Sequence, residues 1–393
     1  MSKILVWLSG GVDSAVVAYL LREAGHEVSC GFMINYISDT PDCPTLVDIE
    51  EARKVALYLG LPFHTFDYRV EYEKRIVEYI YEGYQKWLTP NPDILCNNLV
   101  KFDCFLQEAL EYGFEKIATG HYARIEDASQ KSIKSKIHKV GGDSLILSES
   151  EESRVNITSD TENKEEDLET SSGWQGVYHL LKWVDPNKDQ TYFLSRLNQF
   201  QLSHALFPIG HLTKPEVREI ARRAWLPNAE RKDSQGLCFI GKVSMKEFLE
   251  KRLPKKPGNI LDTNGHTIGE HEGAFSYTIG QRKGIQIGGG PALFVIGKDI
   301  ANNTITVWSE SELELYSSEL TAIDWHWIAE PREFPFSARA KIRYRQEDQD
   351  IECVEDGEDR VRVRFEARQR AITSGQTITV YDWDELIASG IIE

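Results

Sequence analysis

A glycine-containing stretch near the amino terminus has the residue types needed to hold an anion. It runs Ser9-Gly10-Gly11-Val12-Asp13-Ser14, between an apolar run and a helical pattern. Two adjacent glycines let backbone amides approach a bound group, and the start of the following helix favours negative charge. The stretch is neither a Walker A loop nor a G-x-G-x-x-G fingerprint. We expect it to bind phosphate, with Asp13 holding Mg²⁺ or a phosphate-bound water; a compatible alternative is that Asp13 only caps the helix.

The stretch Thr89-Pro-Asn-Pro-Asp-Ile-Leu-Cys-Asn-Asn98 contains a cysteine that could act as a nucleophile. Its two prolines stiffen the chain and are expected to fix Asn91, Asp93 and Cys96 in a loop before a helix. A thiol near a helix start has a lowered pKa and forms more thiolate. Asp93 could exchange a proton with a bound base. The alternative is that Cys96 is a small buried apolar residue.

Cys238 lies in a second polar stretch, Lys232-Asp-Ser-Gln-Gly-Leu-Cys-Phe-Ile-Gly241. Its polar residues and glycines predict an exposed loop, and the nearby Lys232 favours the thiolate. Cys43, between Asp42 and Pro44, is expected to be exposed and has no assigned role. No two cysteines have the C-x-x-C spacing typical of metal sites, so no metal centre is predicted. The cysteines expected in the core are Cys30, Cys104 and Cys353.

The composition is typical of a folded protein without a membrane-spanning segment. The chain has 393 residues, 41% of them hydrophobic, and a mean hydropathy of −0.40. No apolar run approaches the roughly 20 residues of a membrane helix, so we expect a cytoplasmic protein. The net charge of −17 argues against general nucleic-acid coating but permits a local basic groove. Alternating cations at 339–345 and 360–364 would share one strand face, either against RNA or simply in solvent.

Periodicity along the chain predicts an α/β protein with three domains. Alternating apolar runs and helical patterns predict a doubly wound parallel sheet in a nucleotide-binding domain, residues 1–205, with ligands at the carboxyl ends of the strands. An acidic stretch at 126–173 is expected to be a flexible insertion. A small central domain is expected at 206–270, where Thr213-Lys-Pro-Glu216 is a capping box. Short strands and turns at 271–393 predict a C-terminal β-barrel.

The phosphate stretch resembles the loop of the ATP pyrophosphatases, which cleave ATP to AMP and pyrophosphate and adenylate a substrate oxygen. Taken with the two cysteines, the chain resembles the tRNA-specific 2-thiouridylases of the MnmA family over nearly its whole length. It departs from them at Trp7-Leu8, where Gly-Met is usual, and in its longer acidic insertion. The stretches that carry the resemblance are 9–14, Phe32-Met33, Pro90 to Cys96, Ala118 to Tyr122, Lys188 to Gln190, Lys232 to Gly241, Gly280 to Gly284, Arg343 to Gln346 and Ser374 to Gln376.

The resemblance implies a tRNA-uridine 2-sulfurtransferase. ATP, with Mg²⁺, would adenylate the 2-oxygen of the wobble uridine in tRNAs for Lys, Glu and Gln. Sulfur from a cysteine persulfide would then replace that oxygen, giving 2-thiouridine, AMP and pyrophosphate. By the same resemblance Cys238 carries the persulfide, Cys96 is the nucleophile that helps release the sulfur by pairing transiently with Cys238, and Asp93 is the acid/base residue. Met33 and Gly120 match the adenosine end of the ATP site.

The resemblance also implies which residues contact tRNA. Anticodon bases are unstacked and can turn into a pocket that aromatic and polar groups line. His121 could contact the tRNA or, equally, be a structural histidine. The implied contacts are Asn91, Pro92, Asp93, His121, Lys188, Asp189, Gln190, Arg343, Tyr344 and Gln376.

The implied partners are tRNA and a sulfur donor, which would be a cysteine desulfurase or a sulfur-relay protein. Two other functions fit parts of the sequence. An adenylating ligase, such as an amidotransferase-like synthetase, would need the phosphate loop but neither cysteine. An RNA-binding module that has lost catalysis would bind tRNA without releasing pyrophosphate.

Overall fold

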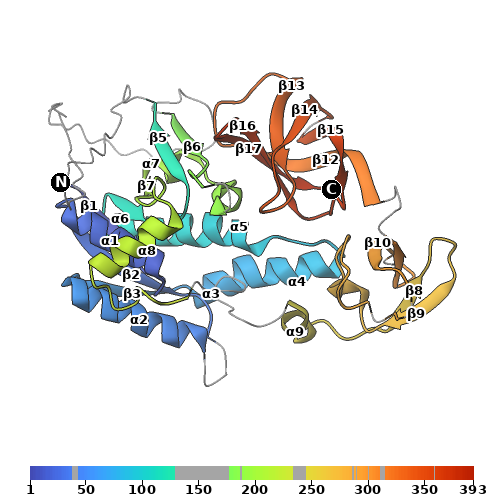
Figure 1. The fold of residues 1–393 in the computed structure, drawn as a ribbon, viewed down its shortest axis with the longest axis horizontal. Helices are drawn as coiled ribbons and strands as arrows, with labels where there is room; N and C mark the ends of the chain where they lie inside the picture. Colours follow the sequence, from blue (N-terminus) through green and yellow to red (C-terminus); the bar gives the residue numbers. More distant parts are fainter. Residues whose placement is uncertain are drawn as a thin grey trace, which may run out of the picture.

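The computed structural model places a parallel α/β unit beside a small four-stranded sheet and a β-barrel (Figure 1). Helices α4 and α5 extend from the α/β unit toward the two β units (Figure 1). Among the helices of the described part, none is long and apolar enough to cross a membrane. The structure describes residues 1–37, 43–128, 177–185, 188–232, 245–285, 287–288, 290–299, 301–309, 315–357 and 359–393.

The α/β unit is built on a parallel sheet with the strand order β3-β2-β1-β4-β7. Successive residues of β1 point to opposite faces, so Ile4 packs with α1, α2 and α8, and Leu5 packs with the helices of the other face. The strand order reverses between β1 and β4, and such a switch point is where α/β sheets bind ligands. The predicted doubly wound sheet is confirmed. The elements are β1 (Lys3–Trp7), β2 (Glu27–Ile34), β3 (Phe63–Asp67), β4 (Lys116–Ala118), β7 (Ala205–Leu206), α1 (Val12–Glu23), α2 (Pro44–Leu59) and α8 (Lys214–Arg223).

Two interrupted helices cover the second face of the sheet. The middle part of each, η1 and η2, is π-helical, a conformation often found at functional sites. Pro92 stands in the first turn of the second helix, where its missing N–H costs little. This helix therefore begins before Cys96, and the expectation of a loop around Cys96 is wrong. The elements are α3 (Arg69–Tyr72), η1 (Glu73–Val77), α4 (Glu78–Gln85), α5 (Pro92–Cys96), η2 (Asn97–Cys104) and α6 (Phe105–Glu111).

The predicted insertion lies within an antiparallel hairpin. Strand β5 (Arg124–Asp127) pairs with β6 (Tyr178–Leu181), and Ala128 N donates to Val177 O at 3.0 Å. Residues 129–176, which include most of the insertion, lie outside the described part of the chain. Because the two flanks meet at this hydrogen bond, the segment between them can vary in length without displacing the sheet.

Two β units form the rest of the molecule. The smaller is a sheet with the order β10-β11-β8-β9. The larger is a six-stranded barrel, β12-β15-β14-β13-β16-β17, closed by pairing of β12 with β17 and extended by β6 and β5. The strands are β8 (Gly258–Leu261), β9 (Thr267–His271), β10 (Leu293–Asp299), β11 (Thr304–Ser309), β12 (Tyr316–Trp327), β13 (Phe336–Lys341), β14 (Gln349–Glu355), β15 (Arg360–Arg370), β16 (Thr377–Asp382) and β17 (Glu385–Ile392), and the short helices are η4 (Thr191–Leu194), α7 (Gln199–Ser203), α9 (Met245–Glu250) and η5 (Ala274–Ser276).

These units group the elements differently from the expected domain limits. Helix α8 follows residue 206, yet Val217 and Ala221 pack in the same cluster as α1. Its predicted capping box is present, since Thr213 N donates to Glu216 Oε2 at 2.7 Å. Strands β10 and β11 follow residue 270, yet β11 pairs with β8 and β10 pairs with β11, so both belong to the small sheet rather than to the barrel. Both differences arise from long-range packing that local periodicity does not contain.

We expect replacement of 129–176 by a four-residue turn to leave the melting temperature unchanged or slightly higher. Shortening a loop whose ends already meet lowers the entropy cost of closing it, by about 2 kcal/mol for this change in length. Thermal unfolding followed by circular dichroism would measure the effect. A clear fall in melting temperature would show that the segment packs against the rest of the chain.

Candidate active site

Residues 9–14 form a tight loop between β1 and α1. Ser9 N donates to Ser14 Oγ at 3.1 Å, and Ser14 Oγ lies within hydrogen-bond distance of Gly11 O, also at 3.1 Å. Gly10 has a φ of +78°, and a Cβ there would lie 2.6 Å from Asp48 O. Glycine is therefore required at this turn, and the buried Val12 anchors the helix start that follows.

The Asp13 carboxylate joins three segments that are far apart in sequence. Tyr122 Oη donates to Asp13 Oδ1 at 2.7 Å, and Lys214 Nζ donates to the same oxygen at 2.6 Å. The Asp13 side chain remains 26% exposed, so a ligand can reach it. Sequence reasoning missed Lys214, because this residue stands 201 positions away and its local pattern shows only an ordinary helix start.

Gly120 packs directly on the start of α1. A Cβ at Gly120 would lie 2.9 Å from Ser14 N and 3.1 Å from Asp13 Cβ. The absence of a side chain thus lets the segment after β4 approach the phosphate loop. The Met33 side chain is fully buried in the hydrophobic cluster on the second face of the sheet, and its backbone is in register with Phe66 of β3.

The predicted nucleophile and acid/base residue lie on the first turns of one helix. Asn91 precedes the helix in an extended conformation, Pro92 begins it, and Asp93 lies in its first turn. Cys96 ends α5 with its side chain 1% exposed, packed in the hydrophobic cluster of the second face. Any reaction at this thiol therefore takes place away from bulk water.

Cys238 lies outside the described residues, which stop at 232 and resume at 245. The segment that leads toward it is fixed to the phosphate loop. Arg231 Nη1 and Asn228 Nδ2 donate to Gly10 O at 2.9 and 3.0 Å. Arg231 also pairs with Asp48 at 2.5 Å; burial raises the pKa of Asp48, and the guanidinium opposes that rise. Arg231, which sequence reasoning also missed, therefore holds this segment beside the loop.

The barrel meets the Cys96 stretch at Thr89. Thr89 N donates to Ser374 O at 2.9 Å, and Gln376 Nε2 donates to Thr89 O at 2.6 Å. A Cβ at Gly375 would lie 2.8 Å from Thr89 N, so the two backbones are in close contact. These bonds place Gln376, a predicted tRNA residue, near Asn91, two residues beyond Thr89 in the chain.

Arg343 and Tyr344 follow the end of β13. The Tyr344 ring packs on Phe193, with centroids 4.4 Å apart. Arg343 donates to Ala371 O, and burial and the nearby Arg370 lower its pKa. Both side chains are half-buried and held by packing from two segments.

Asp189 is held inside the protein rather than at its surface. Its side chain accepts hydrogen bonds from Trp183 N at 3.1 Å and from Thr191 Oγ1 at 2.8 Å. Lys341 Nζ, from the barrel strand β13, lies 3.6 Å from Asp189 Oδ2. The residue is 5% exposed, so this geometry supports a positioning role for its carboxylate more than a contact with tRNA.

The neighbours of Asp189 lie against Tyr122. Gln190 Oε1 accepts a hydrogen bond from Tyr122 N at 2.9 Å, which fixes the segment that carries the Tyr122 hydroxyl to Asp13. The Lys188 ammonium lies 5.7 Å from the centre of the Tyr122 ring. The predicted stretch 188–190 therefore places one cation close to the phosphate loop.

His121 packs among aromatic side chains. It is 7% exposed, and its Nδ1 lies 2.7 Å from Thr119 Oγ1. Its ring centre is 5.8 Å from those of Phe102 and Phe207. Burial, with a smaller effect of Lys101, lowers the pKa of His121 well below 6.5. This packing favours the structural role that the sequence left open.

The expected basic face at 339–345 is wrong. Strand β13 ends at Lys341, which is 8% exposed and lies 3.6 Å from Asp348 as well as from Asp189. Arg345 has a φ of +66° in the turn that follows. The cations therefore do not share one extended strand.

The second set of alternating cations lies on β15 as predicted, but acidic side chains neutralise it. Every arginine of the set, at 360, 362 and 364, is paired with a carboxylate. This arrangement favours a solvated outer face of the barrel over an RNA contact. The pairs are Arg360 with Glu393, Arg362 with Asp356 and Arg364 with Glu352.

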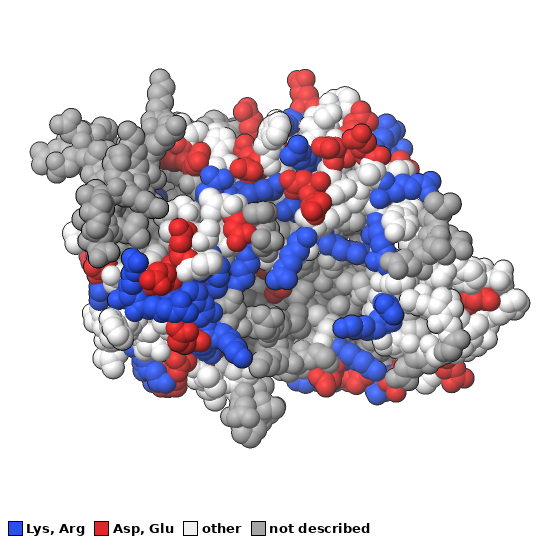
Figure 2. Space-filling view, in the orientation of Figure 1, with Lys and Arg blue, Asp and Glu red and all other residues white. Residues whose placement is uncertain are grey.

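Basic side chains nevertheless gather on one face of this acidic protein. Figure 2 shows Lys and Arg side chains at several places around the middle of this face, with Asp and Glu side chains among them. Cations grouped on a surface attract anionic ligands such as RNA.

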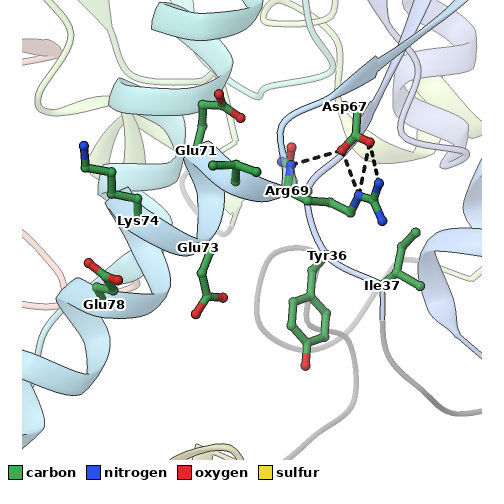
Figure 3. Close-up of a pocket in the computed structure, with 10 residues that line it drawn as sticks. Tyr36, Ile37, Asp67, Arg69, Glu71, Glu73, Lys74 and Glu78 are labelled. Atoms are coloured by element: carbon green, nitrogen blue, oxygen red, sulfur yellow. Dashed lines mark hydrogen bonds and ion pairs between the residues drawn. The ribbon is translucent and has the colours of Figure 1, made fainter.

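A separate groove of about 990 Å³ lies beyond the ends of β2 and β3 (Figure 3). Its charges are mainly acidic, and Asp67 and Arg69 within it are bonded to each other. An acidic lining disfavours phosphate, and none of the predicted site residues lies in it. The lining residues are Asn35, Tyr36, Ile37, Asp67, Arg69, Val70, Glu71, Glu73, Lys74 and Glu78.

Comparison with family models identifies the class of the protein. The tRNA methyl transferase HUP domain matches residues 2–159 and 168–242. The tRNA methyl transferase PRC-barrel domain matches 246–309, and the aminomethyltransferase beta-barrel domain matches 317–392. The chain is thus an HUP domain followed by two β domains, in agreement with the three units of the structure.

Full-length relatives identify the family. A tRNA-specific 2-thiouridylase MnmA of Shouchella clausii is 39% identical over 100% of this chain and 96% of its own. Another of Nitrosococcus oceani is 41% identical over 99% and 96%. Among solved structures, U34-tRNA thiolase NcsA from Methanococcus maripaludis matches 30% of this chain and 38% of its own, with 21% identity and a TM-score of 0.24, too weak a similarity to carry an argument. The chain belongs to the tRNA-specific 2-thiouridylase family.

We expect Gly120→Ala to weaken ATP binding about tenfold or more. The added methyl would press on Ser14 N, and overpacking of this kind costs roughly 1–3 kcal/mol. Isothermal titration with Mg·ATP would measure the change. The control is Gly297→Ala, whose nearest contact is 3.8 Å away. Equal affinities in the two variants would show that Gly120 does not shape the site.

The burial of His121 predicts a loss of stability in acid. The folded chain keeps this ring neutral, whereas the unfolded chain binds a proton below pH 6.5. Its contribution is therefore complete above pH 6.5 and is lost as the pH falls, by up to about 1.4 kcal/mol per pH unit. His121→Gln should reduce the fall in melting temperature between pH 6.5 and 5, and the exposed His266→Gln should not. An identical fall in all three proteins would contradict this assignment.

Proposed function

We propose that this chain is an ATP-dependent tRNA-uridine 2-sulfurtransferase that makes 2-thiouridine at the wobble position of tRNAs for Lys, Glu and Gln. Two contacts support the proposal best: the barrel loop at 374–376 lies against the stretch that begins the Cys96 helix, and the segment that precedes the Cys238 stretch lies against the phosphate loop. Thr89 forms the first of these contacts, and Gly10 bonds the segment that leads to Cys238.

ATP is the first substrate in this proposal. Residues 9–14 would hold its phosphates, and Gly120 and Met33 would lie at the adenosine end. The partly exposed Asp13 carboxylate is a suitable oxygen ligand for Mg²⁺, which would neutralise phosphate charge. Because Gly120 has no side chain, no Cβ presses on Ser14 N at the helix start that would face the phosphates.

Two bond exchanges would transfer the sulfur. The uridine 2-oxygen attacks the α-phosphorus, and pyrophosphate leaves with the electron pair of the broken P–O bond. The terminal sulfur of a Cys238 persulfide then attacks C2, Asp93 accepts a proton, and AMP leaves with the former 2-oxygen.

Cys96 would complete the reaction by thiol–disulfide exchange. Its thiolate attacks the inner sulfur on Cys238, the S–S bond to the product breaks, and the 2-thiolate remains on the uridine. The two cysteines are left as a disulfide, which a thiol reductant returns to the active form. The burial of Cys96 suits this role, because a thiol shielded from bulk water reacts away from competing hydrolysis.

The remaining residues would bind the anticodon. Asn91, Pro92 and Asp93 would surround the target base, with Lys188, Arg343, Tyr344 and Gln376 around the adjoining backbone. Asp189 and Gln190 would position this surface from within. The sulfur donor would be a cysteine desulfurase or a relay protein, and reactive thiols of this kind suit the reducing cytoplasm.

We expect 2-thiouridine to form when unmodified tRNA is incubated with the protein, ATP, Mg²⁺ and a sulfur source. Mass spectrometry of the nucleosides would detect it. Cys96→Ser and Cys238→Ser should reduce the product by about 1,000-fold or more, since each removes an obligatory nucleophile. Cys104→Ser, on the same helix as Cys96, keeps a donor to Leu99 O and should remain active.

The other outcomes separate the alternatives. Full thiolation by both Cys96→Ser and Cys238→Ser would refute the proposed chemistry. ATP cleavage without thiolation that survives both substitutions would favour an adenylating ligase. Binding of tRNA without pyrophosphate release would favour an RNA-binding module.

A further inference from the structure

The phosphate loop contains no cation of its own. In loops of the Walker A class, a lysine within the motif reaches the β- and γ-phosphates, but residues 9–14 have none. An ammonium reaches this loop from elsewhere, since Lys214 Nζ lies 2.6 Å from Asp13 Oδ1. Lys214 is the first residue of α8, which packs on the same face of the sheet as α1.

We propose that Lys214 supplies the missing cation: it neutralises Asp13 in the absence of nucleotide and binds the β- and γ-phosphates of ATP when Mg·ATP enters. This inference rests on the proposed ATP-dependent function and adds a catalytic residue to it. Because α8 is fixed by packing, the ammonium needs only its own flexible stem to move between the two anions.

Competition for one carboxylate explains why Lys214 would move. Asp13 Oδ1 already accepts hydrogen bonds from Tyr122 and Lys214. A divalent cation bound by Asp13 repels the ammonium at short range, and the incoming phosphates attract it. The Lys214 side chain is 18% exposed, so water screens these interactions only in part.

The same ammonium would assist the adenylation step. As the uridine 2-oxygen bonds to the α-phosphorus and the bond to the bridging oxygen breaks, negative charge grows on the departing pyrophosphate. A cation fixed beside that group lowers the barrier, because it interacts more strongly with the leaving group than with bound ATP.

The test measures the affinity of the Lys214→Met variant for two ligands, with neither tRNA nor a sulfur source present. Calorimetry with Mg·ATP should show binding weakened by about 10- to 100-fold, as expected for a lost charged hydrogen bond. Electron paramagnetic resonance with Mn²⁺ alone should show binding tightened by about threefold or more, because Asp13 loses a competing cation. A residue with only a structural role would not move the two affinities in opposite directions.

Two further variants support the test. Lys214→Arg keeps a cation and should bind ATP within about fivefold of the unmodified chain. Arg223→Met removes an exposed cation of the same helix, paired with Glu219 at 2.9 Å, and should change neither affinity.

The outcomes are distinct. Unchanged ATP affinity in Lys214→Met, or weakening of both ATP and Mn²⁺, would overturn the inference. The predicted opposite shifts in a chain that never forms 2-thiouridine would support the role of Lys214 and refute the proposed function instead.

Discussion

The buried ion pair between Asp189 and Lys341 fixes the barrel against the α/β unit. Removing one partner of a buried pair commonly costs about 3–5 kcal/mol, because the other charge is left in a poorly polar environment. The chain passes directly from Asp189 to Gln190, which holds the backbone of Tyr122, and the Tyr122 hydroxyl bonds to Asp13. Consecutive contacts therefore set the barrel in place relative to the phosphate loop.

Charge is distributed unevenly over this acidic chain, and the distribution is consistent with the two anionic substrates proposed above, ATP and tRNA. The arginines at 360, 362 and 364 on the barrel exterior are each paired with a carboxylate. Lys188 and Lys214 instead lie around Tyr122 and Asp13, where the cations face the phosphate loop. A net charge of −17 is thus compatible with local attraction of ATP and RNA.

Local sequence patterns were sufficient to predict the parallel sheet and the final barrel, because the strands and helices of each follow short-range periodicity. They were insufficient where the local conformation depends on contacts between segments that are far apart in the sequence. The π-helical turns at 97–104 depend on packing against the sheet. The direction in which the Lys341 side chain points depends on the carboxylates of Asp189 and Asp348, which lie beside its ammonium. The contact of Lys214 with Asp13 spans 201 positions, so no local signal could reveal it.

The closure of the barrel has a consequence for how the chain is made. Strand β17 pairs with β16, β12 and β6, so the barrel cannot close before residues 385–392 exist. The parallel sheet is complete by residue 206, well before them. During synthesis from the amino terminus, domains fold in the order in which they emerge. A nascent chain on the ribosome therefore acquires the loop at 9–14 first, and the loop at 374–376 takes its place against Thr89 last.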